Sequence, residues 1–178
     1  MNSRMLLTMV VLLAAPALAQ VERTGGASST FSGKGPGGFK LEGTTDQVSL
    51  KDDGKTVSIS VPLSTLKTGI DLRDRHMREK YLEVEKYPNA VLEVAWAAVQ
   101  LPADGQTSTQ TVPGKMTVHG KTHDVSVTYT LKRTGDTYDA SGKVPLNLKD
   151  YDIILPNYLG VTVKPEIDTL TTFQFKKK

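Results

Sequence analysis

Apolar and polar side chains alternate along several short segments of this chain, and no other feature constrains its fold as strongly. At 57–61 the apolar Val57, Ile59 and Val61 alternate with serines. Similar alternation occurs at 90–99, 116–118, 125–131, 137–144 and 167–175. Because successive side chains of a strand point to opposite faces, each run predicts a strand with one apolar face. Short strands at this spacing indicate an all-β sandwich or barrel.

A barrel is favoured by the uniformity of the two faces of each strand. Serine, threonine and charged residues share one face, and aliphatic residues share the other, which suits a sheet closed around an apolar interior. Closure also removes exposed strand edges. The uniform faces therefore favour a barrel over a sandwich, and a barrel of about eight strands is either filled by side chains or holds one ligand.

Other segments break the alternation. Asp71 precedes good helix formers and Asp74 follows three residues later, so we expect a helix over 71–82 that Asp71 caps. A hairpin is expected to join 48–50 to 57–61. We expect a flexible segment with short strand pieces at 24–40, a surface loop at 102–111, a turn at 119–123 and irregular structure at 145–163.

The first nineteen residues have the composition of a cleavable secretory signal. Arg4 supplies a positive charge, the apolar stretch 5–15 is too short to span a bilayer, and 17–19 places small residues where a signal peptidase cuts. We expect residues 1–19 to be removed and 20–178 to form one domain. The chain contains no cysteine, so neither disulfides nor a lipid anchor on cysteine is expected.

The charge balance argues against nucleic acid as a partner. Lysine and arginine number 22 against 19 aspartate and glutamate, and no basic run is interleaved with aromatic residues. The densest charge lies in the expected helix, where Arg73, His76 and Arg78 can face an anionic headgroup. Spacings of three and four between opposite charges favour ion pairs on a solvated helix face instead.

Candidate metal-binding and catalytic residues are few. His119 and His123 lie four residues apart and His76 is a third imidazole, but Gly120 predicts a turn there and not the helix that this spacing requires. The Ser-x-x-Lys pattern at 64–67 lacks its companion motifs. We expect no metal site, no catalytic set and no cofactor. A hydrolase built on that serine or on His76 is a third-ranked hypothesis.

Several segments together resemble the YceI-like family. The matching segments, in order and spacing, are 61–70, 73–78, 81–88, 114–122, 150–153 and 159–163. The resemblance runs from about residue 28 to the C-terminus. It implies an exported bacterial protein with a lipocalin-like antiparallel barrel, which holds a long isoprenoid or other amphiphilic lipid in an elongated apolar cavity and performs no catalysis.

The resemblance and the strand faces together predict the residues of the binding site. The expected cavity lining consists of Phe31, Phe39, Val57, Ile59, Val61, Met77, Tyr81, Leu92, Val94, Trp96, Met116, Val118, Val127, Tyr129 and Leu131. The expected headgroup contacts are Arg73, His76 and Arg78.

The leading hypothesis is a periplasmic protein that transports, stores or sequesters an isoprenoid or other long-chain amphiphile. The expected partner is that lipid, without a stable membrane anchor, and the sequence leaves open whether two copies form a homodimer. The alternative is a barrel filled by Phe39, Trp96, Tyr129 and Phe173, which acts through its surface or in envelope stress.

Overall fold

The structure of this chain is a computed structural model that describes residues 21–158 and 161–178. The predicted signal sequence at 1–19 lies outside the described residues. In the described ranges, no helix combines the length and the apolar character needed to cross a membrane.

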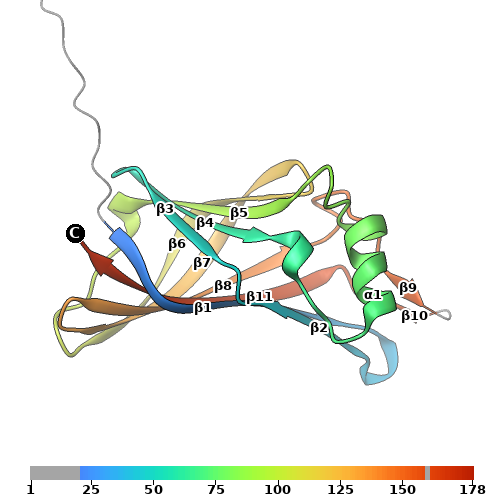
Figure 1. Ribbon diagram of the computed structural model, residues 1–178, viewed down its shortest axis with the longest axis horizontal. Coiled ribbons are helices and arrows are strands. Elements are labelled where there is room, and N and C mark those ends of the chain that lie inside the picture. The colour runs from blue at the N-terminus through green and yellow to red at the C-terminus, as the bar shows by residue number, and fades with distance from the viewer. Residues whose placement is uncertain (1–20, 159–160) are drawn as a thin grey trace, which may run out of the picture.

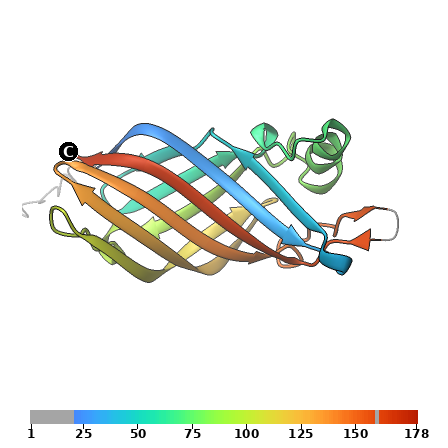
Figure 2. The same cartoon turned by 90° about the horizontal axis from the view of Figure 1, so that it is seen from below.

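Nine strands form one antiparallel sheet that curls around a long axis (Figures 1 and 2). Their order across the sheet is β2-β1-β11-β8-β7-β6-β5-β4-β3. The strands are β1 (Val21–Lys34), β2 (Lys40–Thr45), β3 (Ser49–Asp52), β4 (Thr56–Pro62), β5 (Asn89–Ala95), β6 (Thr107–Val118), β7 (Lys121–Thr134), β8 (Thr137–Asn147) and β11 (Glu166–Lys177). A separate small hairpin consists of β9 (Asn157–Tyr158) and β10 (Val161–Thr162). The predicted antiparallel β fold is confirmed, including the hairpin of β3 and β4.

The edges of the curled sheet meet through a few contacts. Thr44 of β2 and Lys67 exchange backbone hydrogen bonds of 2.9 and 3.0 Å in an isolated antiparallel bridge. The hydroxyls of Thr45 and Thr65 are hydrogen-bonded at 2.7 Å. Near the other end, the backbone N–H of Val21 donates to Asp52 Oδ2 at 2.9 Å. Within the described residues the sheet is thus a half-barrel whose edge strands β2 and β3 are not paired in a ladder.

Strand β1 corrects the prediction of a flexible segment at 24–40. It pairs with β11 along most of its length, with a register shift between Thr24 and Ala27, and its second half also pairs with β2. The irregular part is confined to the short turn η1 (Pro36–Gly38) that joins β1 to β2. Glycine, serine and threonine give no apolar alternation, so periodicity does not reveal this strand.

Strands β6 and β8 are longer than predicted. β6 begins inside the predicted loop 102–111, because each residue of β6 has a partner on β7. β8 continues into the predicted irregular segment 145–163, where Pro145 pairs with Asp168 of β11. In both cases the neighbouring strand supplies backbone hydrogen-bond partners that the local sequence does not indicate.

His119 and Gly120 alone form the turn between β6 and β7. Both have a positive φ, 51° and 74°, as the two central residues of a type I′ hairpin require. A Cβ at Gly120 would also lie 2.5 Å from a ring carbon of Tyr87. The prediction of a turn is confirmed, but it is shorter than 119–123 because β7 begins at Lys121.

The predicted helix lies beside one end of the curled sheet (Figures 1 and 2). It consists of α1 (Asp71–His76) followed by the π-helical turn η3 (Met77–Tyr81), in which the N–H of Leu82 donates to the carbonyl of Met77 at 2.9 Å. The capping role predicted for Asp71 is wrong, because Ile70 is the N-cap and makes no side-chain cap bond.

Candidate functional site

A cavity of about 610 Å³ lies inside the curled sheet. Strand β11 illustrates how its wall is built, since every second residue lines it: Ile167, Thr169, Thr171, Phe173 and Phe175. These eight residue steps extend about 27 Å along the strand at about 3.4 Å per residue. The cavity is therefore elongated, as a site for a chain-like molecule must be.

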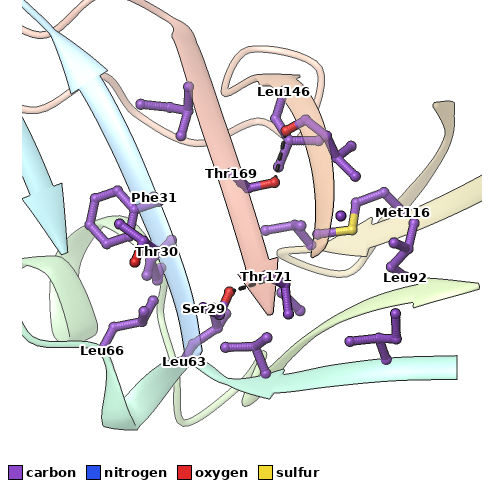
Figure 3. A pocket seen from close by; sticks show the side chains of 18 of the residues that line it. Ser29, Thr30, Phe31, Leu63, Leu66, Leu92, Met116, Leu146, Thr169 and Thr171 are labelled. Atoms are coloured by element: carbon purple, nitrogen blue, oxygen red, sulfur yellow. Dashed lines mark hydrogen bonds between the residues drawn. The ribbon is translucent and has the colours of Figure 1, made fainter. Parts of the chain in front are cut away.

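All fifteen side chains that were expected to line a cavity lie in its wall. Figure 3 shows several of them, with Phe31, Leu92 and Met116 surrounding one space from β1, β5 and β6. The rings of Trp96 and Phe173, which would help to fill a solid barrel, also belong to the wall. The interior is hollow, contrary to the filled-barrel alternative.

Several lining residues were not predicted. They include Val144 and Leu146 of β8 and Ile167, Thr169 and Thr171 of β11. Alternation from Ile167 to Phe175 predicts the strand β11 itself, but Thr169 and Thr171 interrupt its apolar face, so the strand was not expected to line a cavity. Their hydroxyls are tolerated in the wall because they have hydrogen-bond partners.

The polar atoms of the wall are largely engaged within the protein. The hydroxyls of Ser29 and Thr171 are hydrogen-bonded at 2.9 Å, as Figure 3 shows, and Thr169 donates to the carbonyl of Val144 at 2.8 Å. The hydroxyl of Tyr129 accepts the N–H of Gln100 at 2.8 Å. Burial of a polar group against hydrocarbon costs free energy unless the group has a hydrogen-bond partner. Because these hydroxyls have partners within the wall, the wall is suited to hydrocarbon.

The mouth of the cavity lies at the end of the sheet beside the helix. The lining residues that are exposed to solvent are Phe39, Ile70, Leu72, His76 and Asn157. They belong to the β1–β2 connection, the start of the helix and β9, which gather at one end in Figures 1 and 2. The interior is therefore open to solvent at this end.

The opposite end is covered by packed aromatic rings. Tyr138 stacks on Phe175, with ring centroids 4.9 Å apart and planes inclined by 9°, and both side chains are buried. Trp96 follows β5 at this end, where its backbone N–H donates to the carbonyl of Lys55 at 2.7 Å. Trp96 is the only tryptophan of the chain, so its fluorescence reports on the far end of the cavity.

Of the predicted headgroup contacts, Arg73 and His76 line the cavity and Arg78 does not. The half-buried Arg73 donates from Nε to Thr68 Oγ1 at 2.7 Å and from Nη2 to the Thr68 carbonyl at 2.6 Å. These bonds hold the guanidinium at the mouth. Arg78 follows His76 by two residues, and residues two apart on a helix do not share a face, so Arg78 does not join Arg73 and His76 in the wall.

Asp74 anchors the start of the helix from a buried position. Its Oδ1 accepts both the backbone N–H of Thr68, at 2.7 Å, and the Thr68 hydroxyl. Only 5% of Asp74 is exposed. Thr68 therefore connects Asp74 with Arg73, and this group fixes the segment that borders the mouth.

His119 connects the segment after the helix to the sheet. Its Nε2 lies 2.7 Å from Glu83 Oε2, and its Nδ1 lies 3.0 Å from the carbonyl oxygen of Tyr151. The edge of its ring meets Tyr87, with centroids 4.5 Å apart. His119 thus has a structural contact at both ring nitrogens.

Two ionisable neighbours of this group have shifted pKa values. Burial raises the pKa of the Tyr151 phenol, and the negative charge of Asp150 adds to the effect. The hydrogen bond and positive charge of Lys121 lower the pKa of Asp152 below its ordinary value. Both effects have local structural causes.

The described ranges contain no group of three metal-ligating side chains. Ser64, the serine of the Ser-x-x-Lys pattern, is exposed in the short turn η2 (Leu63–Thr65) and does not line the cavity. Of the two sequence candidates for catalysis, His76 lines the cavity and Ser64 does not.

A family model for the YceI-like domain matches residues 18–175. No curated protein matches the chain. A polyisoprenoid binding domain from Saccharophagus degradans, implicated in plant cell wall breakdown, is similar in structure, with a TM-score of 0.72 and 16% identity over 92% of this chain and 100% of that chain.

Two further solved structures have a similar fold. Burkholderia cenocepacia BcnA gives a TM-score of 0.66 at 19% identity, covering 83% of this chain and 95% of that chain. A Campylobacter jejuni YCEI protein gives 0.50 at 10% identity, covering 96% of this chain and 91% of that chain. At these identities the likeness concerns the fold.

Proposed function

Since the chain belongs to the YceI-like family, we propose that it is a lipid-binding protein that encloses the apolar chain of an amphiphile. The observation that carries this proposal is the elongated cavity of about 610 Å³, whose hydroxyls are hydrogen-bonded within the wall. The apolar tail of a ligand can contact such a wall along the whole length of the cavity. Binding requires no covalent chemistry and no cofactor.

Burial of the tail supplies the affinity. Each methylene removed from water contributes about 0.8 kcal/mol, so ten enclosed methylenes contribute about 8 kcal/mol, the free energy of a micromolar complex. Losses of translational and rotational freedom on association reduce this value. A long tail that fills more of the cavity compensates for these losses.

An isoprenoid is the preferred ligand class, with Arg73 and His76 facing its headgroup at the mouth. The description of the Saccharophagus degradans domain as polyisoprenoid-binding supports this choice. The secretory features of residues 1–19 and the family match support a role in the periplasm, as a carrier or store of the lipid.

The proposal is tested by blocking the cavity at Gly142. Its strand neighbours at alternate positions, Ala140 and Val144, line the cavity, and a Cβ added at Gly142 would meet no atom within 4 Å. We therefore expect Gly142→Phe to place a ring in the cavity while the sheet stays folded.

Fluorescence of Trp96 measures the effect in titrations with geranyl, farnesyl and geranylgeranyl monophosphates. The wild-type response should grow with tail length, because Trp96 lies at the end opposite the mouth. Gly142→Phe should weaken binding of the longest ligand by about tenfold or more, and Gly142→Ala should bind like the wild type. Equal binding by Gly142→Phe, with its fold verified by circular dichroism, would show that the cavity is not the site.

A further inference from the structure

We propose that the rim of the cavity mouth is a docking surface for an anionic lipid bilayer. The proposal rests on the proposed function, because it concerns how an amphiphile enters the cavity. The rim is defined by Phe39, Ile70, Leu72 and Ile154, together with Lys34, Lys40 and Lys164.

Exposed apolar side chains are concentrated at this rim. Of the five large apolar residues that are exposed in the described ranges, Phe39 is 39% exposed, Leu72 47%, Ile70 53% and Ile154 67%. The fifth, Leu170, lies within β11 and does not line the cavity. The β1–β2 connection, the start of the helix and the segment before β9 carry the four rim residues, and all three lie at one end of the molecule (Figures 1 and 2).

The apolar rim continues into the cavity. Phe39, Ile70 and Leu72 are exposed and also line the interior. If these side chains enter the apolar boundary of a bilayer, a tail passes from the membrane to the cavity without crossing water. A bilayer thereby supplies both the docking partner and the source of the ligand.

Basic side chains next to Phe39 favour anionic headgroups. Lys34 faces Lys40 across the β1–β2 pair, and the backbone N–H of Lys164 donates to the carbonyl of Lys34 at 2.7 Å. All three are exposed, and none forms an ion pair among the described residues. The segments 33–41 and 161–165 contain no acidic residue.

The same charges argue against a second copy of the chain as the occupant of the rim. A symmetric dimer through this surface would bring the same lysines from two copies together, and like charges repel. Anionic phospholipids instead neutralise them, and each lysine near such a surface strengthens binding.

Sedimentation with vesicles tests the docking surface on the full folded protein. Vesicles of phosphatidylcholine with phosphatidylglycerol should bind the wild type, and vesicles of phosphatidylcholine alone should bind it several-fold more weakly. Ile154→Ser, and separately the triple variant Lys34→Gln, Lys40→Gln and Lys164→Gln, should each lower the partition coefficient for the anionic vesicles by about fivefold or more.

Matched controls come from elsewhere on the sheet. Leu170→Ser removes an exposed apolar residue away from the rim, and the triple variant Lys51→Gln, Lys132→Gln and Lys143→Gln removes the same charge from exposed positions on other strands. Both controls should bind anionic vesicles like the wild type. Equal losses in the controls and the rim variants would overturn the proposal.

Two further outcomes would also overturn docking to a bilayer. One is absence of wild-type binding to anionic vesicles. The other is a dimer in size-exclusion chromatography that Ile154→Ser dissociates, which would assign the rim to a second copy. A titration of Trp96 fluorescence with geranylgeranyl monophosphate distinguishes a failure of bilayer docking from a failure of the proposed lipid binding. Ile154 does not line the cavity, so Ile154→Ser should bind this free ligand like the wild type.

Discussion

At the scale of single residues, the cavity depends on where side-chain volume is absent. Gly43 of β2 faces Phe31 of β1, and a Cβ at Gly43 would lie 2.4 Å from Phe31 Cε1. The ring of Phe31 thus packs directly over the glycine and forms part of the cavity wall. At Gly142 the corresponding space is open.

Gly43→Ala should destabilise the protein, because the new methyl group displaces the Phe31 ring. We expect a loss of about 1–3 kcal/mol in the free energy of unfolding, measured with urea. In a Phe31→Ala background the same substitution should have a much smaller effect, and the difference gives the interaction energy of the pair. Gly142→Ala is the control, with stability close to the wild type. A loss in Gly43→Ala that is unchanged by removal of Phe31 would contradict this packing.

At this scale the sequence predicts many of the aliphatic and aromatic lining residues but none of the serines and threonines. The alternating aliphatic residues of β4 and β7 indicate one buried face directly. Ser29 and Thr171 are tolerated in the wall because their hydroxyls are hydrogen-bonded to each other at 2.9 Å. The two residues lie far apart along the chain, so composition does not reveal this pairing.

At the scale of elements, two features of the helical segment were not visible in the sequence. The start of the helix is anchored by Asp74 through Thr68, and not by a cap at Asp71. After His76 the helix continues as a π-helical turn, which regular helical spacing does not indicate. Helical periodicity assumes regular geometry and cannot anticipate either feature.

Asp74→Ala should therefore destabilise the helical segment more than Asp71→Ala. Removal of the Asp74 carboxylate leaves the backbone N–H of Thr68 without its acceptor and should lower the free energy of unfolding by about 2 kcal/mol. Asp71→Ala removes only a favourable charge at the helix start, which contributes about 0.3–1 kcal/mol. Urea unfolding of the two variants compares them, and an equal or larger loss in Asp71→Ala would favour the cap that the sequence predicted.

Strands were predictable where one face is aliphatic and not where both faces are polar. β4 and β5 follow the alternation of their sequences, whereas β1 and the first half of β6 are rich in threonine, serine and glycine. These segments become strands because β11 pairs with β1 along most of its length and β7 pairs with every residue of β6. Such pairing joins distant segments, so local sequence does not specify it.

At the scale of the whole molecule, the sheet, its covered end and its open mouth form one elongated container. Buried Tyr138 and Phe175 cover one end, and the helical segment borders the mouth at the other. The general architecture followed from strand periodicity and the resemblance to the family. The volume of the cavity did not, since it depends on how far opposite walls stand apart across the curled sheet.

The most direct test of the proposed function is the lipid content of the protein after expression in a bacterium. The full chain is expressed with its own N-terminal segment, purified from the periplasm without detergent, extracted with organic solvent and examined by mass spectrometry. We expect about one long-chain amphiphile per wild-type protein, as one elongated cavity permits, and at least tenfold less, or roughly none, with Gly142→Phe. A wild-type extract free of lipid, or equal lipid in the folded Gly142→Phe variant, would contradict a lipid-holding cavity.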